Sequence, residues 1–415
     1  MRPPSPQPRK PHPMPQDHRP NRIDRQRPDA PILAGFGAHK VGVQTLHLIN
    51  PDQLDIRHAT NTNTPSYDRP LTVEMWYPAD SPTAPGTQYH TVLRDGVTPV
   101  TLSGSAIRDA APIAAARMCP LVILSHGYPG NRFLMGHLGE NLASKGYVVA
   151  SIDHTDSTYQ DKSPLGSTLI NRPYDTRFVI DALADMHDGP AHLADTDRVA
   201  IIGYSMGGYG ALVSGGAGVS QAAVDFAGGA PARLLGCHQV GDPRHLAQKD
   251  QRLKAIVPIG PWGRARGIWD AAGLAGLSTP MLLIAGSADD VSGYADGMRR
   301  IFEETIATSR HLLTFDHAGH NAAAPIPAPE ESWHPVDTLD FVPFEHYADT
   351  VWDGVRMNNI AQHFITAFLG QHLKSDPAMA AFLGAVPDQS PAETWPGFAP
   401  GTQRGLRLEY RQPLG

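Results

Sequence analysis

Hydrophobic and polar positions divide the chain into short apolar runs with amphipathic stretches between them. Residues 41–48 (VGVQTLHL) and 71–78 (LTVEMWYP) alternate apolar and polar positions, as antiparallel strands with one buried face do. Later runs are apolar at almost every position, which indicates strands of a parallel sheet covered on both faces. These runs are 120–127, 147–154, 198–205, 253–260, 280–287 and 310–320. The pattern therefore predicts eight strands.

Between the apolar runs lie segments with the period of an amphipathic helix. They are 133–146, 174–189, the residues after 205, 294–307 and 357–374. Alternating strands and helices predict an α/β fold with a doubly wound, mostly parallel sheet and helices on both faces. In such a sheet the active site lies at the carboxyl ends of the strands.

The pattern also suggests where the domain begins and ends. Residues 1–31 combine proline and arginine with few apolar side chains, so we expect a disordered tail. We expect one catalytic domain over 32–385 and an irregular extension over 386–415, in which only 405–410 could form a short strand. The segments 155–173 and 217–250 break the alternation and are expected to be lids or pocket walls.

Composition and charge narrow the function further. The net charge is -7 and gives no basic patch, so we expect no nucleic-acid partner. Two cysteines, Cys119 and Cys237, are too few for a disulfide framework and show no metal-ligand spacing, so neither a metal nor another cofactor is expected. No apolar run reaches the roughly 18 residues that cross a bilayer, and no apolar leader is evident. The expected location is cytoplasmic, without membrane binding, and the oligomeric state is left open.

One serine lies in a turn built from small residues. Gly203-Tyr204-Ser205-Met206-Gly207 matches G-x-S-x-G, follows the strand predicted over 198–205 and leads into a predicted helix. This placement resembles the nucleophile elbow of the α/β-hydrolase fold. Glycine suits 203 and 207 because a Cβ there would clash where strand and helix approach closely. Ser205 is the expected nucleophile.

A serine hydrolase also needs donors for the oxyanion that forms when the serine attacks a carbonyl. The sequence Ser125-His126-Gly127-Tyr128-Pro129-Gly130 follows the first long parallel strand, where this fold carries its oxyanion loop. We expect the backbone N–H groups of Tyr128 and Met206 to be the donors. His126 is expected to shape this loop by hydrogen bonding rather than to act as the base.

The resemblance implies that acid and base follow the serine in the order acid, then histidine. His320 follows the last strand of the alternating region and is the expected base, with His317 as its rival. The acid should orient the imidazole and stabilise its protonated form.

Three aspartates are candidates for that acid. Asp289 comes at the end of the strand predicted over 280–287, at a spacing common in this fold, and is preferred. Asp290 is its neighbour and could replace it. Asp225 lies twenty residues after the serine, within the segment 217–250, and is the third candidate.

Several motifs together resemble one branch of the α/β-hydrolase superfamily. The branch holds dienelactone-hydrolase-like proteins and type II platelet-activating-factor acetylhydrolases, and the motifs are WYP (76–78), SHGYPGNR (125–132), GYSMGG (203–208), GSADD (286–290) and HAGH (317–320). The resemblance implies the same donors, Tyr128 and Met206. It departs from the acetylhydrolases because the run 253–260 ends without a carboxylate, and from dienelactone hydrolases because position 205 is serine and not cysteine. A general esterase is therefore favoured.

The expected function is that of a serine hydrolase which cleaves short-chain or aryl carboxylic esters through an acyl-enzyme. Its expected partner is a small-molecule ester. The same residues could serve amide or C–C bond cleavage, or a lyase reaction, because one fold hosts many chemistries. A non-catalytic binding protein on a hydrolase scaffold is the third possibility.

Overall fold

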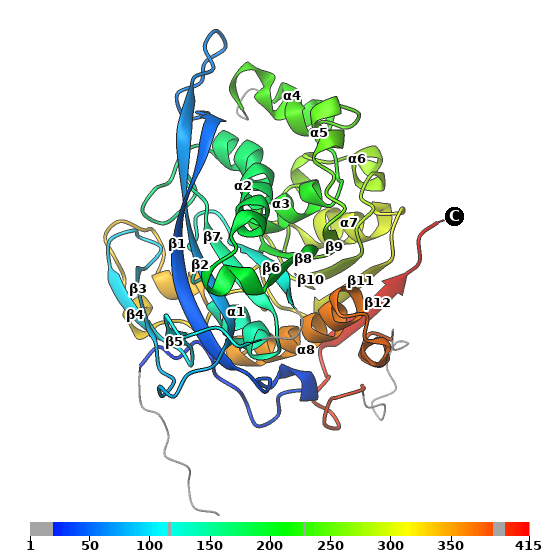
Figure 1. Ribbon diagram of the computed structural model, residues 1–415. Coiled ribbons are helices and arrows are strands. Elements are labelled where there is room, and N and C mark those ends of the chain that lie inside the picture. The colour runs from blue at the N-terminus through cyan, green and yellow to red at the C-terminus, as the bar shows by residue number, and fades with distance from the viewer. Residues whose placement is uncertain (1–19, 115–117, 227–229, 385–394, 415) are drawn as a thin grey trace, which may run out of the picture.

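A large twisted sheet forms the centre of the molecule (Figure 1). The computed structural model describes residues 20–114, 118–226, 230–384 and 395–414. The sheet has the strand order β12-β11-β10-β9-β8-β6-β7-β2-β1-β5. Its strands are β1 (Lys40–Leu54), β2 (Ser66–Ala79), β5 (Ile107–Arg108), β6 (Cys119–Ser125), β7 (Val148–Asp153), β8 (Ala194–Tyr204), β9 (Leu253–Ile259), β10 (Met281–Gly286), β11 (Arg310–Phe315) and β12 (Leu406–Arg411).

All eight predicted strands lie in this sheet, and those from β6 to β11 pair in parallel. The predicted number of eight is corrected to ten, because β5 and β12 join the two edges. β5 has only two residues, too few to leave a pattern in the sequence. β12 lies in the extension expected to be irregular, at the one stretch there, 405–410, that could form a short strand. It pairs antiparallel with β11 through all six of its residues. Residues 385–394 of that region lie outside the described residues.

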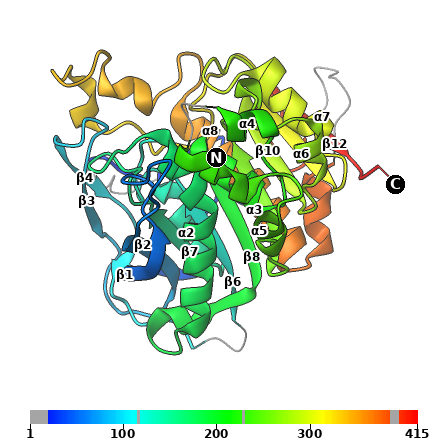
Figure 2. The same ribbon diagram turned by 90° about the horizontal axis from the view of Figure 1, so that it is seen from above.

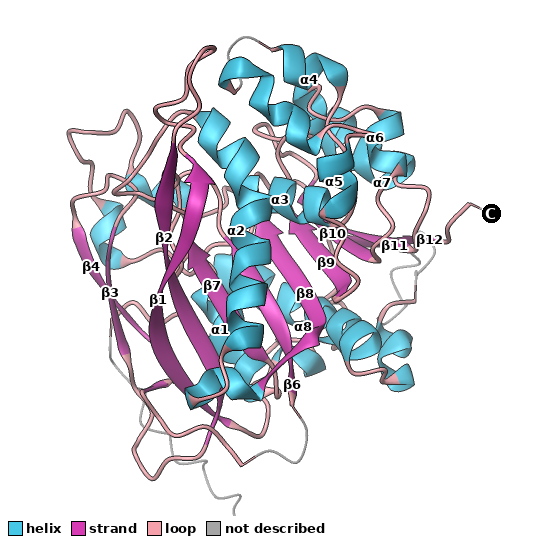
Figure 3. Cartoon of the chain, turned by 45° about the horizontal axis from the view of Figure 1, so that its top comes forward, coloured by secondary structure: helices cyan, strands magenta, loops and turns pink. Residues whose placement is uncertain are grey.

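Helices cover both faces of the sheet (Figure 3). Helices α1 (Gly136–Ser144) and α8 (Gly354–Leu373) pack on one face. The other face carries α2 (Leu165–Asp185), α3 (Met206–Ser214), α6 (Ala271–Ala275) and α7 (Arg300–Glu304). Alternate residues of β6 serve the two cores: Val122 and Leu124 face α1 and α8, whereas Leu121 and Ile123 face α2 and α3. Burial on both faces explains the continuous apolar runs.

Helix α2 corrects one prediction. The segment 155–173 was expected to be an irregular lid, but its second half is the first part of α2, which continues through Pro173. Proline has no N–H for the carbonyl four residues earlier. Here the Tyr209 hydroxyl donates to that carbonyl, of Leu169, at 2.9 Å. A hydrogen bond from α3 thus replaces the one that Pro173 cannot make, and α2 continues where the sequence alone indicates that a helix would end.

The N-terminal prediction is also corrected in part. Residues 1–19 lie outside the described residues, but residues 20–31 are packed against the domain. Ile23 is buried in the core, and its N–H donates to the carbonyl of Ser103 at 3.0 Å. Arg22 pairs with the buried Asp24. One apolar anchor and charges paired locally are enough to order a segment whose composition predicts disorder.

Outside the main sheet, β3 (Gln88–Val92) and β4 (Pro99–Ser103) form a hairpin. The long connection from β11 to α8 runs beside this hairpin, where it is coloured gold in Figure 2. The segment 217–250 contains α4 (Gln221–Asp225) and α5 (Pro243–Ala247). Within the described ranges, no helix is both long and apolar enough to cross a bilayer.

Candidate active site

Ser205 occupies a sharp turn between β8 and α3. Its backbone has φ 54° and ψ −110°, a conformation that is strained for a residue with a side chain. A Cβ added at Gly203 would overlap the backbone of Gly207, and one added at Gly207 would overlap the carbonyl oxygen of Ser125. The two glycines are therefore required by the close approach of strand and helix, for the reason that the sequence suggests.

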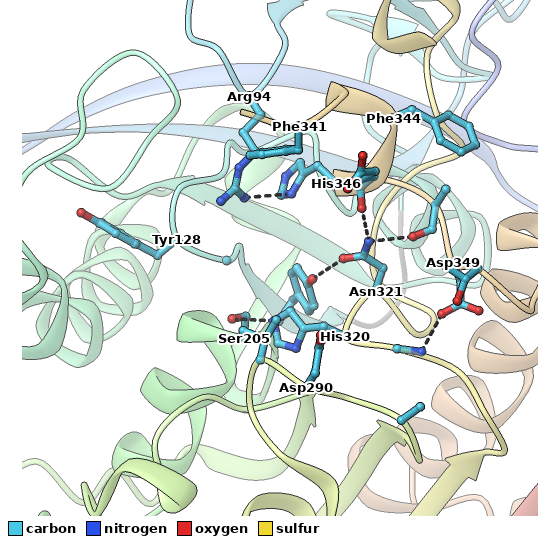
Figure 4. Close-up of a pocket in the computed structure, with 18 of the residues that line it drawn as sticks. Arg94, Tyr128, Ser205, Asp290, His320, Asn321, Phe341, Phe344, His346 and Asp349 are labelled. Atoms are coloured by element: carbon cyan, nitrogen blue, oxygen red, sulfur yellow. Dashed lines mark hydrogen bonds between the residues drawn. The ribbon is translucent and has the colours of Figure 1, made fainter. Parts of the chain in front are cut away.

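Three predicted residues form a continuous hydrogen-bonded chain. His320 Nε2 lies 3.0 Å from Ser205 Oγ (Figure 4). On its other side, His320 Nδ1 lies 2.9 Å from Asp289 Oδ2. The other oxygen of Asp289 accepts the N–H groups of Val291 and Ser292 at 3.0 and 2.8 Å. Since Asp289 is held from both sides, Nδ1 of the imidazole donates to it and Nε2 is left to accept the serine proton.

The rival residues lie elsewhere. Asp290 is exposed at the edge of the pocket, and in the described part of the chain His320 bonds to Asp289 and Ser205 instead. Asp225 ends α4, is exposed and pairs with Arg233. His317 is exposed too, and its N–H donates to Ser287 Oγ. The structure thus brings Asp289 and His320 to Ser205 and leaves the three rivals outside this chain.

The two predicted backbone donors flank the serine. Met206 is the first residue of α3, where an N–H has no carbonyl four residues earlier in the helix. Tyr128 follows Gly127, where an added Cβ would lie 3.6 Å from the Cβ of Ser205. Among the described residues, no backbone carbonyl accepts the Tyr128 N–H. Both N–H groups therefore belong to backbone next to the serine oxygen.

Ser205 and His320 open into a pocket of about 560 Å³. None of the described residues of the predicted walls 155–173 and 217–250 lines this pocket, which corrects that prediction. Part of 155–173 is used to build α2, and 217–250 packs beside it. The lining comes instead from the oxyanion loop, from the β3–β4 turn and from the loops after β10 and β11; its outer members include Arg94, Tyr128, Asn321, Phe341, Phe344 and His346.

Apart from Tyr128, the outer residues of this pocket have no local signal in the sequence. Arg94 donates to His346 Nδ1 at 2.9 Å, and its guanidinium lies 5.5 Å from the centre of the Phe341 ring (Figure 4). Burial, together with the charge of Arg94, holds the pKa of His346 well below its usual value. The neutral imidazole therefore accepts from Arg94 and donates to the Tyr159 hydroxyl, 2.7 Å from Nε2.

Asn321 joins this outer wall to the nucleophile elbow. Its side-chain oxygen accepts the Tyr204 hydroxyl at 2.8 Å, and its amide donates at 2.7 Å to the carbonyls of Glu345 and Ala348. Since Asn321 directly follows His320, the base and the outer wall are fixed by adjacent residues.

A second serine, histidine and aspartate set lies inside the protein. Ser125 Oγ is 2.9 Å from His154 Nε2, and His154 Nδ1 is 2.9 Å from Asp175 Oδ2. All three are buried and none lines the pocket. Burial lowers the pKa of His154 to about 4, so the imidazole is neutral. Burial alone would raise the pKa of Asp175, yet the charge of Arg69 and the bonds from His154 and Arg69 lower it. Within the described residues, this set therefore lies apart from the pocket at Ser205.

No group of three histidine, cysteine, aspartate or glutamate side chains in the described ranges is arranged to hold a metal ion.

Comparisons with known proteins place the chain among ester hydrolases at low identity. A family model described as PET hydrolase-like matches residues 77–232, which include Tyr128 and Ser205 but end before Asp289. Cutinase est2 of Thermobifida alba is 24% identical over 202 residues, 48% of this chain and 52% of that protein. Cutinase cut1 of Thermobifida fusca is 25% identical over 202 residues, 48% of this chain and 49% of that protein. The chain thus spans about half the length of these curated relatives.

The fold has a solved counterpart. The structure of a ferulic acid esterase from Streptomyces cinnamoneus superposes with a TM-score of 0.59 and 18% identity, covering 95% of this chain and all of that one. At this identity the likeness shows the fold alone. The expected superfamily and fold are confirmed, whereas the narrower branch stays a prediction.

Proposed function

Since this chain belongs to the α/β-hydrolase superfamily, we propose that it is a serine hydrolase that cleaves carboxylic esters through an acyl-enzyme. The observation that carries the proposal is the chain Ser205–His320–Asp289 at the opening of a pocket. The similarity to cutinases and the fold of an enzyme named as a ferulic acid esterase support ester bonds as the target.

The reaction follows from the positions of these atoms. Ser205 Oγ attacks the ester carbonyl carbon while His320 Nε2 takes its proton, and Asp289 stabilises the imidazolium. The carbonyl oxygen becomes an oxyanion, which accepts the N–H groups of Tyr128 and Met206. When the tetrahedral intermediate collapses, His320 returns the proton to the departing alcohol. Water then attacks the acyl-serine by the same route and releases the acid.

The lining of the pocket favours aryl and short-chain esters. Tyr128, Phe341 and Phe344 present aromatic surface near Ser205, and Arg94 lies over the Phe341 ring. Aromatic faces hold a flat apolar group at low entropic cost. A cavity of about 560 Å³ suits a small-molecule ester.

The first prediction concerns the nucleophile. Purified protein is expected to hydrolyse p-nitrophenyl acetate and butyrate, and Ser205→Ala is expected to lower kcat/KM by about 10⁴-fold or more, because the covalent step is lost. The rate of p-nitrophenolate release gives the activity of the wild type and of Ser205→Ala. An equally active Ser205→Ala protein would rule out the mechanism.

The same assay can reject the ester assignment. Matched p-nitroanilides and a β-diketone are tested beside the esters at equal enzyme concentration. A higher kcat/KM on the anilide or the diketone would move the protein to another reaction class.

A further inference from the structure

A buried arginine lies behind the oxyanion loop and does not touch the pocket. Arg172 projects from α2 and is only 1% exposed. Its guanidinium donates to the carbonyl oxygens of His126 and Gly127, the latter at 2.8 Å. It also donates to Ser125 Oγ at 3.2 Å and to Ser157 Oγ at 2.6 Å. Within the described chain, the groups that accept from Arg172 are thus neutral carbonyls and hydroxyls, and none is a carboxylate.

Such a cation is costly to bury. Burial lowers the pKa of Arg172 to about 9, and its Nε has no hydrogen-bond partner within the described chain. A buried charge without a carboxylate partner destabilises a fold unless other contacts offset it. Two of the hydrogen bonds that offset this cost go to consecutive backbone carbonyls beside the nucleophile, those of His126 and Gly127.

The second of those carbonyls determines where an N–H points. In a trans peptide the carbonyl and the following N–H lie in one plane and point in opposite directions. The cis bond in this loop is Tyr128–Pro129, so Gly127–Tyr128 is trans. Because the Gly127 carbonyl points at Arg172, the Tyr128 N–H points the other way. This peptide adjoins the nucleophile, since a Cβ added at Gly127 would lie 3.6 Å from the Cβ of Ser205.

His126 supplies a second donor to the same carbonyl. His126 Nδ1 lies 2.7 Å from the Gly127 oxygen, and Nε2 accepts the N–H of His154 at 3.3 Å. An imidazole that accepts at Nε2 carries its proton on Nδ1 when neutral, so Nδ1 donates to Gly127. Burial, followed by the charge of Arg172, holds the pKa of His126 well below its usual value and keeps the ring neutral.

We propose that Arg172 is the positioning residue of the oxyanion hole, and that its bond to the Gly127 carbonyl keeps the Tyr128 N–H turned toward the substrate. The proposal rests on the esterase function above. Without the bond from Arg172, only His126 holds the Gly127 carbonyl, so the peptide after the permissive Gly127 rotates more readily and can present its carbonyl to the oxyanion. One donor is then lost at the moment when charge develops.

Arg172→Gln and Arg172→Lys test the clamp, with Arg177→Gln as the matched control. Arg177 lies on the same helix but is partly exposed and pairs with Asp181. Active sites are counted with an organophosphonate that labels Ser205, so that kcat is expressed per competent site. We expect Arg172→Gln to lower kcat about 10²-fold, as loss of one oxyanion donor does, with KM within about threefold. Arg172→Lys should recover part of the loss, and Arg177→Gln should match wild type.

A reversible arylboronic acid separates positioning from general damage, because its tetrahedral adduct with the serine places an oxygen where the oxyanion forms. Its affinity should fall in parallel with kcat/KM, whereas the KM of the substrate should hold. A folded Arg172→Gln enzyme with wild-type kcat per site and wild-type boronate affinity would overturn the proposal.

If Arg172→Gln does not fold, Ser157→Ala tests the same idea, since it removes one anchor of the guanidinium. A threefold to tenfold loss of kcat at constant KM supports the clamp, and an unchanged kcat contradicts it. Wild-type protein without esterase activity would instead reject the proposed function, so the two failures are distinguishable.

Discussion

Asp289 and Asp290 are adjacent in the sequence but differ in what their carboxylates can reach. Asp289 is buried, receives two backbone N–H groups and contacts His320 Nδ1. Asp290 is exposed at the pocket edge. Only the first can stabilise an imidazolium from a fixed position, because an exposed carboxylate is solvated and mobile.

We therefore predict that Asp289→Asn lowers kcat by about 10³- to 10⁴-fold, since an amide no longer fixes the tautomer of His320. The matched variants Asp290→Asn and Asp225→Asn should stay within about threefold of wild type. Steady-state hydrolysis of p-nitrophenyl butyrate compares the three proteins. A larger loss of kcat in Asp290→Asn than in Asp289→Asn would show that Asp290, and not Asp289, is the acid.

At this scale the sequence predicts the residues that belong to local motifs. Ser205 and His320 follow from a turn pattern and from chain order, and Asp289 from its spacing after β10. Arg94, His346 and Arg172 were missed because each acts with partners far away along the chain. Arg94 meets His346 across 252 positions, and no local pattern records such a pair.

The elements were predicted well where periodicity is strong and poorly where a tertiary contact overrides a local signal. The apolar runs from 120 to 315 became strands because both of their faces are buried. Pro173 suggested the end of a loop, yet α2 runs through it because Tyr209 satisfies the carbonyl of Leu169. The connection after β11 forms the outer pocket wall, but its sequence has no hydrophobic periodicity from which this position could be predicted.

The repair of α2 leads to a stability prediction. Tyr209→Phe removes the hydroxyl that bonds the Leu169 carbonyl and leaves a buried acceptor unpaired, which costs about 1–3 kcal/mol. Tyr410→Phe is the matched control, because Tyr410 is 38% exposed. Urea unfolding followed by circular dichroism gives the stability of each variant and of the wild type. Equal midpoints for the two variants would show that α2 does not need this bond.

Across the whole molecule, many histidines are buried in neutral form. Burial lowers the pKa of four of them, His137, His154, His238 and His311, to about 4. It lowers that of His363 to about 3. In the unfolded chain these groups titrate near 6.5. Between pH 4 and 6.5 the unfolded state therefore binds more protons than the folded state, so stability rises with pH in this range.

Glu140 opposes this trend. Burial raises its pKa to about 7, so the folded state keeps a proton that the unfolded carboxyl releases above about 4.5. The stabilisation from Glu140 falls as pH rises. Burial also raises the pKa of Asp153, so two carboxyls oppose five imidazoles.

We predict that the free energy of unfolding drops steeply as the pH falls from 6.5 toward 5. Each proton taken up on unfolding contributes about 1.4 kcal/mol per pH unit. Denaturant unfolding at several pH values gives the free energy of unfolding. Calorimetry in two buffers gives the number of protons taken up on unfolding. A midpoint that is constant from pH 7 to pH 5 would contradict the neutral state of these rings.

The buried set Ser125, His154 and Asp175 has a consequence for finding enzymes from coordinates. Its two hydrogen bonds measure 2.9 and 2.9 Å, against 3.0 and 2.9 Å at Ser205. A geometric template of these atoms would return two hits in this protein and could rank the inert one first. A search for new hydrolases should therefore also ask whether a carbonyl carbon can approach the hydroxyl, since the same distances occur in a catalyst and in a structural brace.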